Sequence, residues 1–231
     1  MTKEPPFDEW LRGQLVEAYG MERETWAVDQ VRRVIDKVNG VRNREPKFTV
    51  EVLWLREMTA FTAPGRFIYI SRRLLERLPH DDAVAMALAH EAAHHDLDHL
   101  ADFAGWTRRL PRTTGSWLVA RLFRAIERRI YSQEHEFEAD RYALKLCRQA
   151  NFDGLKCLEL FDIMKQYVLD YGDDEAAYGS DAEQDVQFAE NAADWVFLKL
   201  RAEFSKLGRR THPAISDRKS ALKAELANGR L

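Results

Sequence analysis

The segment His90-Glu91-Ala92-Ala93-His94 places two histidines four residues apart in a run of helix-forming residues. Residues four apart lie on one face of an α-helix, one turn above each other. Two imidazoles in this arrangement can occupy two of the four tetrahedral positions around Zn²⁺. Glu91 stands beside the first histidine, where its carboxylate can reach a metal-bound water as general base without being a ligand. The sequence therefore predicts a helix that carries half of a zinc site.

The residues before His90 indicate that this helix is buried. Pro79, Asp81 and Asp82 mark its start, and acids in a first turn suit the helix dipole. The positions that follow are nearly all apolar: Ala83, Val84, Met86, Ala87, Leu88 and Ala89. A helix that is apolar all round is typical of a protein core. An unpaired imidazole there is costly, which favours metal ligation over a pair of ordinary polar residues.

Length and composition are those of a soluble globular protein that can bury a core. The chain has 231 residues, of which 45% are hydrophobic and 32% charged. We expect a single domain over 1–231, with N-terminal helices in 1–45, the sheet and metal-binding helices in 46–152, and C-terminal helices in 153–231. The formal net charge of −3 gives no reason to expect a nucleic-acid partner.

Several features favour a cytoplasmic location. The first residues, MTKEPPFDEWLRGQL, contain no secretory signal, and no 18 consecutive residues are apolar, so no transmembrane helix is expected. The chain has two cysteines, Cys147 and Cys157, and so few suit a reducing compartment. We expect both to pack as small apolar side chains rather than to form a disulfide or bind metal.

Periodicity predicts a predominantly helical α+β fold. Apolar stripes at helical spacing lie in 7–19 and 25–41. The β-branched and aromatic run 48–55 predicts a strand, and a second short strand at 67–70 follows the turn signal Ala63-Pro64-Gly65. The rest of the chain is helical in pattern. We expect a small β-sheet beside the helix that carries the histidines, with the site between them.

Two segments have unbalanced charge. The segment from Trp106 to Ile130 contains seven arginines, which are interspersed with aromatic and aliphatic residues. This composition suits contact with an anionic membrane surface. A solvated helix that covers the domain is the other interpretation. Asp170 to Asp185 is strongly acidic and predicts a loop, which could neutralise the basic helix or cover a cleft.

A catalytic zinc site needs a third protein ligand and leaves its fourth position to water. Glu136 and Asp140 are four apart and share a helical face. Glu136 could complete the site, while Asp140 could accept the N–H of a ligand imidazole, as metal-bound histidines usually require. Glu134 and Glu138 are alternative ligands that the spacing alone does not exclude.

Two more histidines, His95 and His99, follow the first motif. We expect them to be surface residues or to contact a ligand side chain, rather than to bind the metal themselves.

Three motifs together resemble a known family. HEAAHHDLDH at 90–99, EFEAD at 136–140, and Thr211-His212-Pro213 with Arg218 occur in the order found in the HtpX, Oma1-like and CAAX-prenyl-protease group of zinc metallopeptidases, metallopeptidase family forty-eight. The resemblance covers roughly 61–152 and 211–218. It implies a gluzincin-like fold and one Zn²⁺ per chain held by His90, His94 and Glu136.

The resemblance also assigns roles to the neighbouring residues. It implies Glu91 as the general base, with Asp140 and Arg218 beside the ligands and Asp140 as the partner of a ligand imidazole. It also implies that His212 lies near the metal, where it could steady the oxyanion or occupy the open zinc position in a closed form. Many relatives carry transmembrane helices between the metal motifs, whereas Trp106 to Ile130 is too charged to span a bilayer. The chain therefore resembles a soluble catalytic domain alone.

The predicted function is a zinc-dependent endopeptidase that acts on peptides or unfolded proteins. His212 or Tyr131 could stabilise the developing oxyanion. An extended substrate could pair, as an added strand, with the strand that contains Phe67, Ile68, Tyr69 and Ile70. The alternative is a latent or non-catalytic zinc-binding module that a partner or membrane surface regulates.

Overall fold

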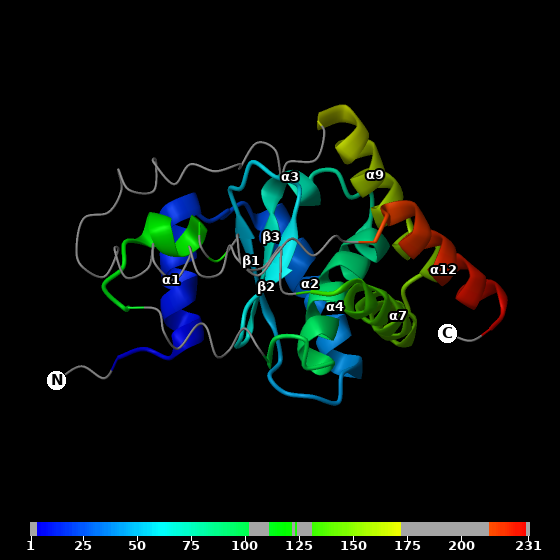
Figure 1. Cartoon of the computed structure of the whole chain (residues 1–231), viewed down its shortest axis with the longest axis horizontal. Helices are drawn as coiled ribbons and strands as arrows, with labels where there is room; N and C mark the ends of the chain where they lie inside the picture. The colour runs from blue at the N-terminus through cyan, green and yellow to red at the C-terminus, as the bar shows by residue number, and fades with distance from the viewer. Residues whose placement is uncertain (1–3, 102–110, 122, 124–130, 172–212, 230–231) are drawn as a thin grey trace.

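The computed structural model describes residues 4–101, 111–121, 123, 131–171 and 213–229 (Figure 1). The helices of this part include α1 (Phe7–Tyr19), α2 (Thr25–Val41), α3 (Arg72–Leu75), α4 (Asp81–Asp96), α7 (Gln133–Gln149), α8 (Gly154–Cys157), α9 (Glu159–Tyr171) and α12 (Ile215–Ala227). The strands are β1 (Thr49–Leu53), β2 (Ala60–Thr62) and β3 (Phe67–Ser71). The predicted α+β class, mainly helical with a small sheet, is confirmed.

The three strands form one sheet in the order β1-β3-β2. β3 pairs with β1 in parallel, and with β2 as an antiparallel hairpin through the predicted turn. Gly65 in this turn has a φ of 125°, and a Cβ atom added to it would lie 2.3 Å from the Cβ of Asp8. Glycine is therefore required at this turn for both its conformation and its small size.

The sheet has helices on both faces, and β3 is buried along its whole length. Successive side chains of a strand point to opposite faces. Ile68 and Ile70 accordingly join the core formed with α2, α4 and α7, while Phe67 and Tyr69 pack with residues of α1. Figure 1 shows α1 on one side of the sheet and α7, α9 and α12 on the other. This two-sided cover explains why the 67–70 pattern is continuously apolar.

Helix α4 is central to the larger core, as its composition predicts. It contacts α2, α7, α8, α9 and two strands of the sheet. His80 caps its first turn by accepting a hydrogen bond from the Ala83 N–H at 3.3 Å. At its other end, Asp96 accepts two hydrogen bonds from the fully buried guanidinium of Arg42, at 2.9 and 2.6 Å. The metal-motif helix is thus capped at its start and fixed at its other end to the residue that follows α2.

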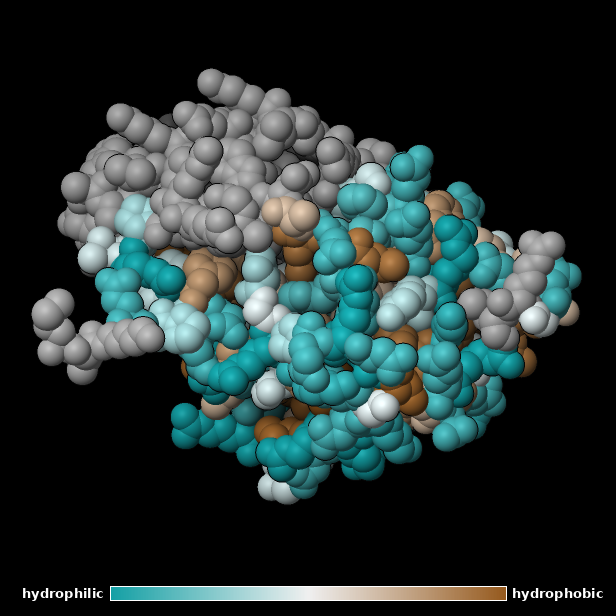
Figure 2. Space-filling model, turned by 90° about the horizontal axis from the view of Figure 1, so that it is seen from below, coloured by the Kyte–Doolittle hydropathy of each residue, from teal (hydrophilic) through white to brown (hydrophobic). Residues whose placement is uncertain are grey.

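No helix among the described residues is long and apolar enough to cross a bilayer. The face in Figure 2 is mainly hydrophilic, with hydrophobic residues in small separate patches. Much of the basic segment Trp106 to Ile130, and nearly all of the acidic segment Asp170 to Asp185, lie outside the described residues. Their predicted roles stay predictions.

Candidate metal centre

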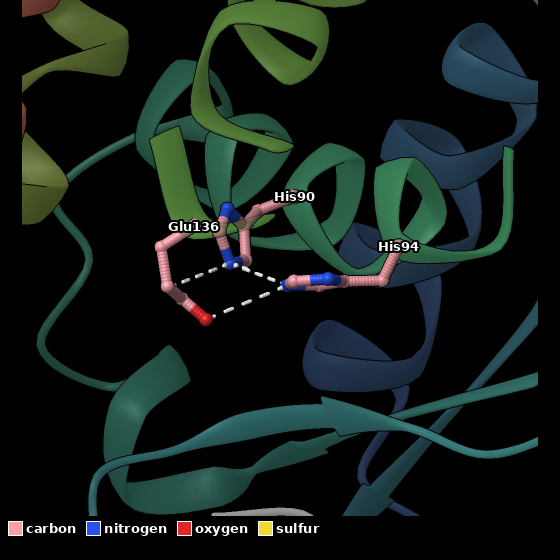
Figure 3. Close-up of side chains that lie close together, drawn as sticks. All are labelled: His90, His94 and Glu136. Carbon is pink, nitrogen blue, oxygen red and sulfur yellow. Dashed lines mark hydrogen bonds and ion pairs between the residues drawn. The ribbon is translucent and has the colours of Figure 1, made fainter. Parts of the chain in front are cut away.

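Helix α4 brings the rings of His90 and His94 together. Their Nε2 atoms lie 3.1 Å apart, and the rings meet nearly edge to face with an interplanar angle of 86°. His94 is almost fully buried, with 1% of its surface exposed. Figure 3 shows both imidazoles pointing to the same point beside the helix. The predicted i, i+4 placement of two imidazoles on one helical face is therefore present.

Glu136 comes from the first turn of α7, which begins after Ser132. The Ser132 side chain accepts a hydrogen bond from the His135 N–H at 3.1 Å and so fixes the start of this helix. One Glu136 carboxylate oxygen lies 3.5 Å from His90 Nε2, and the other lies 3.8 Å from His94 Nε2. In Figure 3 the glutamate faces both rings from the neighbouring helix.

The three side chains fit a zinc ion. Tetrahedral coordination with bonds of 2.0–2.1 Å places ligand atoms about 3.3 Å apart. The observed separations of 3.1, 3.5 and 3.8 Å bracket that value. Imidazole nitrogen and carboxylate oxygen are also donors that zinc prefers. Among the described residues, His90, His94 and Glu136 are the one group of three or more such side chains close enough to share an ion.

Asp140 and Arg218 surround the other side of His90. Asp140 Oδ1 lies 3.0 Å from His90 Nδ1. Arg218, on α12, donates two hydrogen bonds to the Asp140 carboxylate, at 2.7 and 2.6 Å. A third guanidinium nitrogen lies 2.8 Å from Glu136. Helix α12 therefore holds both carboxylates that face His90 through Arg218.

Burial and charge act against each other in this cluster. Burial alone would lower the pKa of His90, but its hydrogen bonds with Asp140 and Glu136 outweigh that effect and raise the pKa to about 10. For His94, burial and the nearby His90 both lower the pKa. Burial would raise the pKa of Asp140, yet Arg218 and His90 hold it below its usual value.

Two aromatic side chains cover His94. The Tyr131 ring stacks on it with centroids 3.6 Å apart and an interplanar angle of 18°. His99 Nδ1 lies 3.0 Å from His94 Nδ1, on the side of the ring away from Glu136. His99 itself stacks on His135, with centroids 4.1 Å apart. Of the two positions expected for His99, the surface and contact with His94 or another candidate ligand, the structure shows the buried position against His94.

The remaining predicted residues divide into three cases. Glu91 is buried on α4 next to His90, with 7% of its surface exposed. Glu134 and Glu138 are exposed and lie outside the ligand group, while Glu138 approaches His99 at 3.3 Å. His212 lies outside the described residues.

The predicted mode of substrate pairing on 67–70 is wrong. β3 is the middle strand, and both of its edges are already paired, one with β1 and the other with β2. An added strand needs a free sheet edge, so it cannot join Phe67, Ile68, Tyr69 or Ile70. The sequence pattern missed β2 because a strand of three residues is too short to give a clear alternation.

A family model described as peptidase family M48 matches residues 21–226, which include all five clustered residues of this centre. The chain belongs to this peptidase family. A comparison with curated proteins found no match. M48 metallopeptidases are zinc-dependent, so the family and the local geometry agree on the metal that the His-His-Glu group suits.

The clustered residues of this M48 centre come from three separate segments of the chain. Two ligands come from α4, the third from α7, and the charge partner Arg218 from α12. The model match spans all three helices. The family match does not distinguish the HtpX, Oma1-like and CAAX-prenyl-protease group from the rest of M48.

Proposed function

We propose that this M48 chain is a zinc-dependent endopeptidase in which Glu91 is the general base. The observation that carries the proposal is the convergence of His90, His94 and Glu136, with Glu91 beside the first ligand on the same buried helix turn. A structural zinc site has no need for a carboxylate that is adjacent to the ligands but outside their group. Bound there, Zn²⁺ would supply a Lewis acid that makes water more acidic and polarises a scissile carbonyl.

The side chains around the ligands then have distinct roles. Glu91 takes a proton from the attacking water and passes it to the leaving amine. Asp140 holds His90 through Nδ1, which keeps Nε2 directed at the ligand group. Arg218 restrains Asp140 through two hydrogen bonds and also contacts Glu136. Together these contacts orient the ligands before substrate binds.

The residue that stabilises the oxyanion has two candidates. The first candidate is Tyr131, because its ring lies against His94 and so next to the proposed reaction centre. His212 is the second, and it rests on the resemblance of Thr211-His212-Pro213 to the family motif. A donor in either position would need to face the carbonyl oxygen as charge develops on it.

For the substrate we propose pairing at β2 instead of β3. β2 is an edge strand of the described sheet, and it contacts α4. Thr62 on β2 lies 2.8 Å from His95 Nε2, one residue after the ligand His94. An extended peptide or unfolded protein that joined this edge would run beside the metal-motif helix.

Two further statements are parts of the same proposal. The order of the motifs supports membership of the HtpX, Oma1-like and CAAX-prenyl-protease group, and the low cysteine content supports a cytoplasmic location.

Proteolysis of an unfolded protein such as casein by the zinc-loaded chain tests this function. We expect cleavage that a chelator abolishes and added zinc restores. Glu91→Gln should keep its zinc and lose cleavage, while Glu134→Gln, which changes an exposed glutamate of α7, should cleave like the wild type. Full activity of Glu91→Gln would contradict the assignment of the base. Bound zinc without any cleavage would favour a latent or non-catalytic module.

A further inference from the structure

His99 is held against His94 by the way in which α4 ends. The His99 N–H donates to the His94 carbonyl at 2.9 Å, and the Asp98 N–H donates to the His95 carbonyl at 3.1 Å. Asp98 has a φ of 59°, in the left-handed region. These bonds form a Schellman motif, which reverses the chain and lays the following residue along the last helical turn. The backbone therefore brings His99 next to His94.

The side chains then meet through their Nδ1 atoms, which are 3.0 Å apart. Two ring nitrogens at this distance need one donor and one acceptor between them. His94 directs Nε2 at His90 and Glu136, and Figure 3 shows its second ring nitrogen on the side away from them. If Nε2 gives its lone pair to a metal, the proton of the neutral ring is on Nδ1. His94 is then the donor, and His99 Nδ1 must be the acceptor.

The far side of His99 is consistent with this proton arrangement. A neutral ring that accepts at Nδ1 carries its proton on Nε2. His99 Nε2 lies 3.3 Å from a Glu138 carboxylate oxygen, which is an acceptor. The ring is buried, with 8% exposed, and it is stacked on His135. Its position is thus restrained by a hydrogen bond at each nitrogen and by one ring face.

We propose that His99 is a positioning residue that holds the metal-binding ring of His94 by accepting a hydrogen bond from its Nδ1–H. The two ligand imidazoles thereby have different partners, the Asp140 carboxylate for His90 and a second imidazole for His94. This inference rests on the proposed function to the extent that it takes His94 as a ligand through Nε2. It adds a role that neither the ligand spacing nor the family match assigns.

A matched pair of substitutions separates the hydrogen bond from packing. Asn and Leu have similar shapes, but the Asn Oδ1 can replace the acceptor at the Nδ1 position and Leu cannot. We expect His99→Leu to weaken zinc binding about 10- to 100-fold, the usual effect of losing such a partner, and His99→Asn to stay within about threefold of the wild type. The readouts are the zinc dissociation constant, from competition with a chromogenic chelator, and the thermal midpoint of the chelator-treated protein.

The outcomes distinguish this inference from the proposed function. Wild-type affinity in His99→Leu, or equal losses in both variants, would overturn the role of His99 and leave the zinc site intact. A wild-type chain that binds no zinc would overturn the site itself, and this inference with it.

A measurement on the unmodified protein remains decisive if the Leu variant does not fold. Long-range ¹H–¹⁵N correlation spectra of the zinc-loaded wild type identify which nitrogen of each histidine carries the proton. We expect the proton on Nδ1 of His94 and on Nε2 of His99. A proton on Nδ1 of His99 would contradict the proposal.

Discussion

Asp140 and His90 meet at 3.0 Å between a carboxylate oxygen and Nδ1, on the side of the ring opposite the ligand group. The pair joins α4 to α7 at the metal centre, and Arg218 secures the carboxylate from α12. Because a hydrogen bond at one ring nitrogen fixes the direction of the other, this contact determines where His90 Nε2 points. The orientation of the first ligand thus depends on a residue 50 positions away.

Removal of that carboxylate should weaken metal binding. We expect Asp140→Ala to lower zinc affinity about 10- to 100-fold. Asp162→Ala is the matched control. Asp162 is an exposed acid on α9 that pairs with Lys219, the neighbour of Arg218 on α12, but it lies outside the metal centre. Its affinity should equal that of the wild type. Chelator competition measures both, and unchanged binding in Asp140→Ala would show that His90 needs no such support.

The buried pair of Arg42 and Asp96 should dominate the stability of the α2–α4 contact. Both side chains are essentially inaccessible, and the loss of one leaves the other charge buried and uncompensated. We expect Arg42→Met to reduce the free energy of unfolding by about 3–5 kcal/mol. Arg33→Met removes a half-exposed ion pair with Asp81 between the same helices and should cost about 1 kcal/mol or less. Urea denaturation compares them, and equal losses would contradict the importance of burial.

The turn after α4 offers a backbone test. Asp98 adopts a left-handed conformation that costs a residue with a Cβ atom roughly 1–2 kcal/mol, and glycine avoids most of this cost. Asp98→Gly should therefore fold with equal or higher stability, whereas Asp98→Val should lose about 1 kcal/mol or more. The urea midpoints of the two variants report the difference. A more stable Val variant would contradict the turn geometry.

His95 should make stability depend on pH in acid. Burial, together with the Arg42 charge, lowers its pKa to about 4 despite a hydrogen bond to the Ala63 backbone and the nearby Asp96. The unfolded chain, with a pKa near 6.5, binds the proton more readily between these values. The stabilising effect of the neutral ring is therefore complete above about pH 6.5 and is lost as the pH falls toward 4.

A glutamine variant isolates this contribution. His95→Gln keeps a polar group near Thr62 but cannot titrate. Between pH 6.5 and 4, the wild type should lose about 1–3 kcal/mol more stability than the variant. Denaturation of chelator-treated proteins at several pH values provides the comparison. Parallel pH profiles would show that His95 is not held neutral by the fold.

Much of the fold follows from local sequence signals. The helical stripes in 7–19 and 25–41 match α1 and α2, and the apolar run before His90 matches a helix buried on nearly all sides. These signals are strong because periodicity repeats over several turns. The three-residue strand β2 gives no comparable signal. Its pairing with β3 is decided by tertiary contacts and by the turn at Gly65.

The site shows the same division between local and long-range information. The His90–His94 pair follows from helical spacing alone. The choice of Glu136 over Glu134 and Glu138 needs the angle between α4 and α7, which a spacing rule does not contain. The pairing of His99 with His94 depends on the residue at which α4 ends, and the apolar pattern of the sequence does not predict that residue. The division of the chain into the predicted ranges 1–45, 46–152 and 153–231 stays a prediction.

The metal content of the purified chain tests the central claim most directly. Elemental analysis of protein never exposed to chelator should give one zinc per chain for the wild type, and little or none for His94→Ala or Glu136→Ala. Circular dichroism of the same samples would establish that the variants are folded. A wild-type chain without zinc, not restored by added metal, would contradict the proposed centre, as would a full zinc complement in the folded His94→Ala variant.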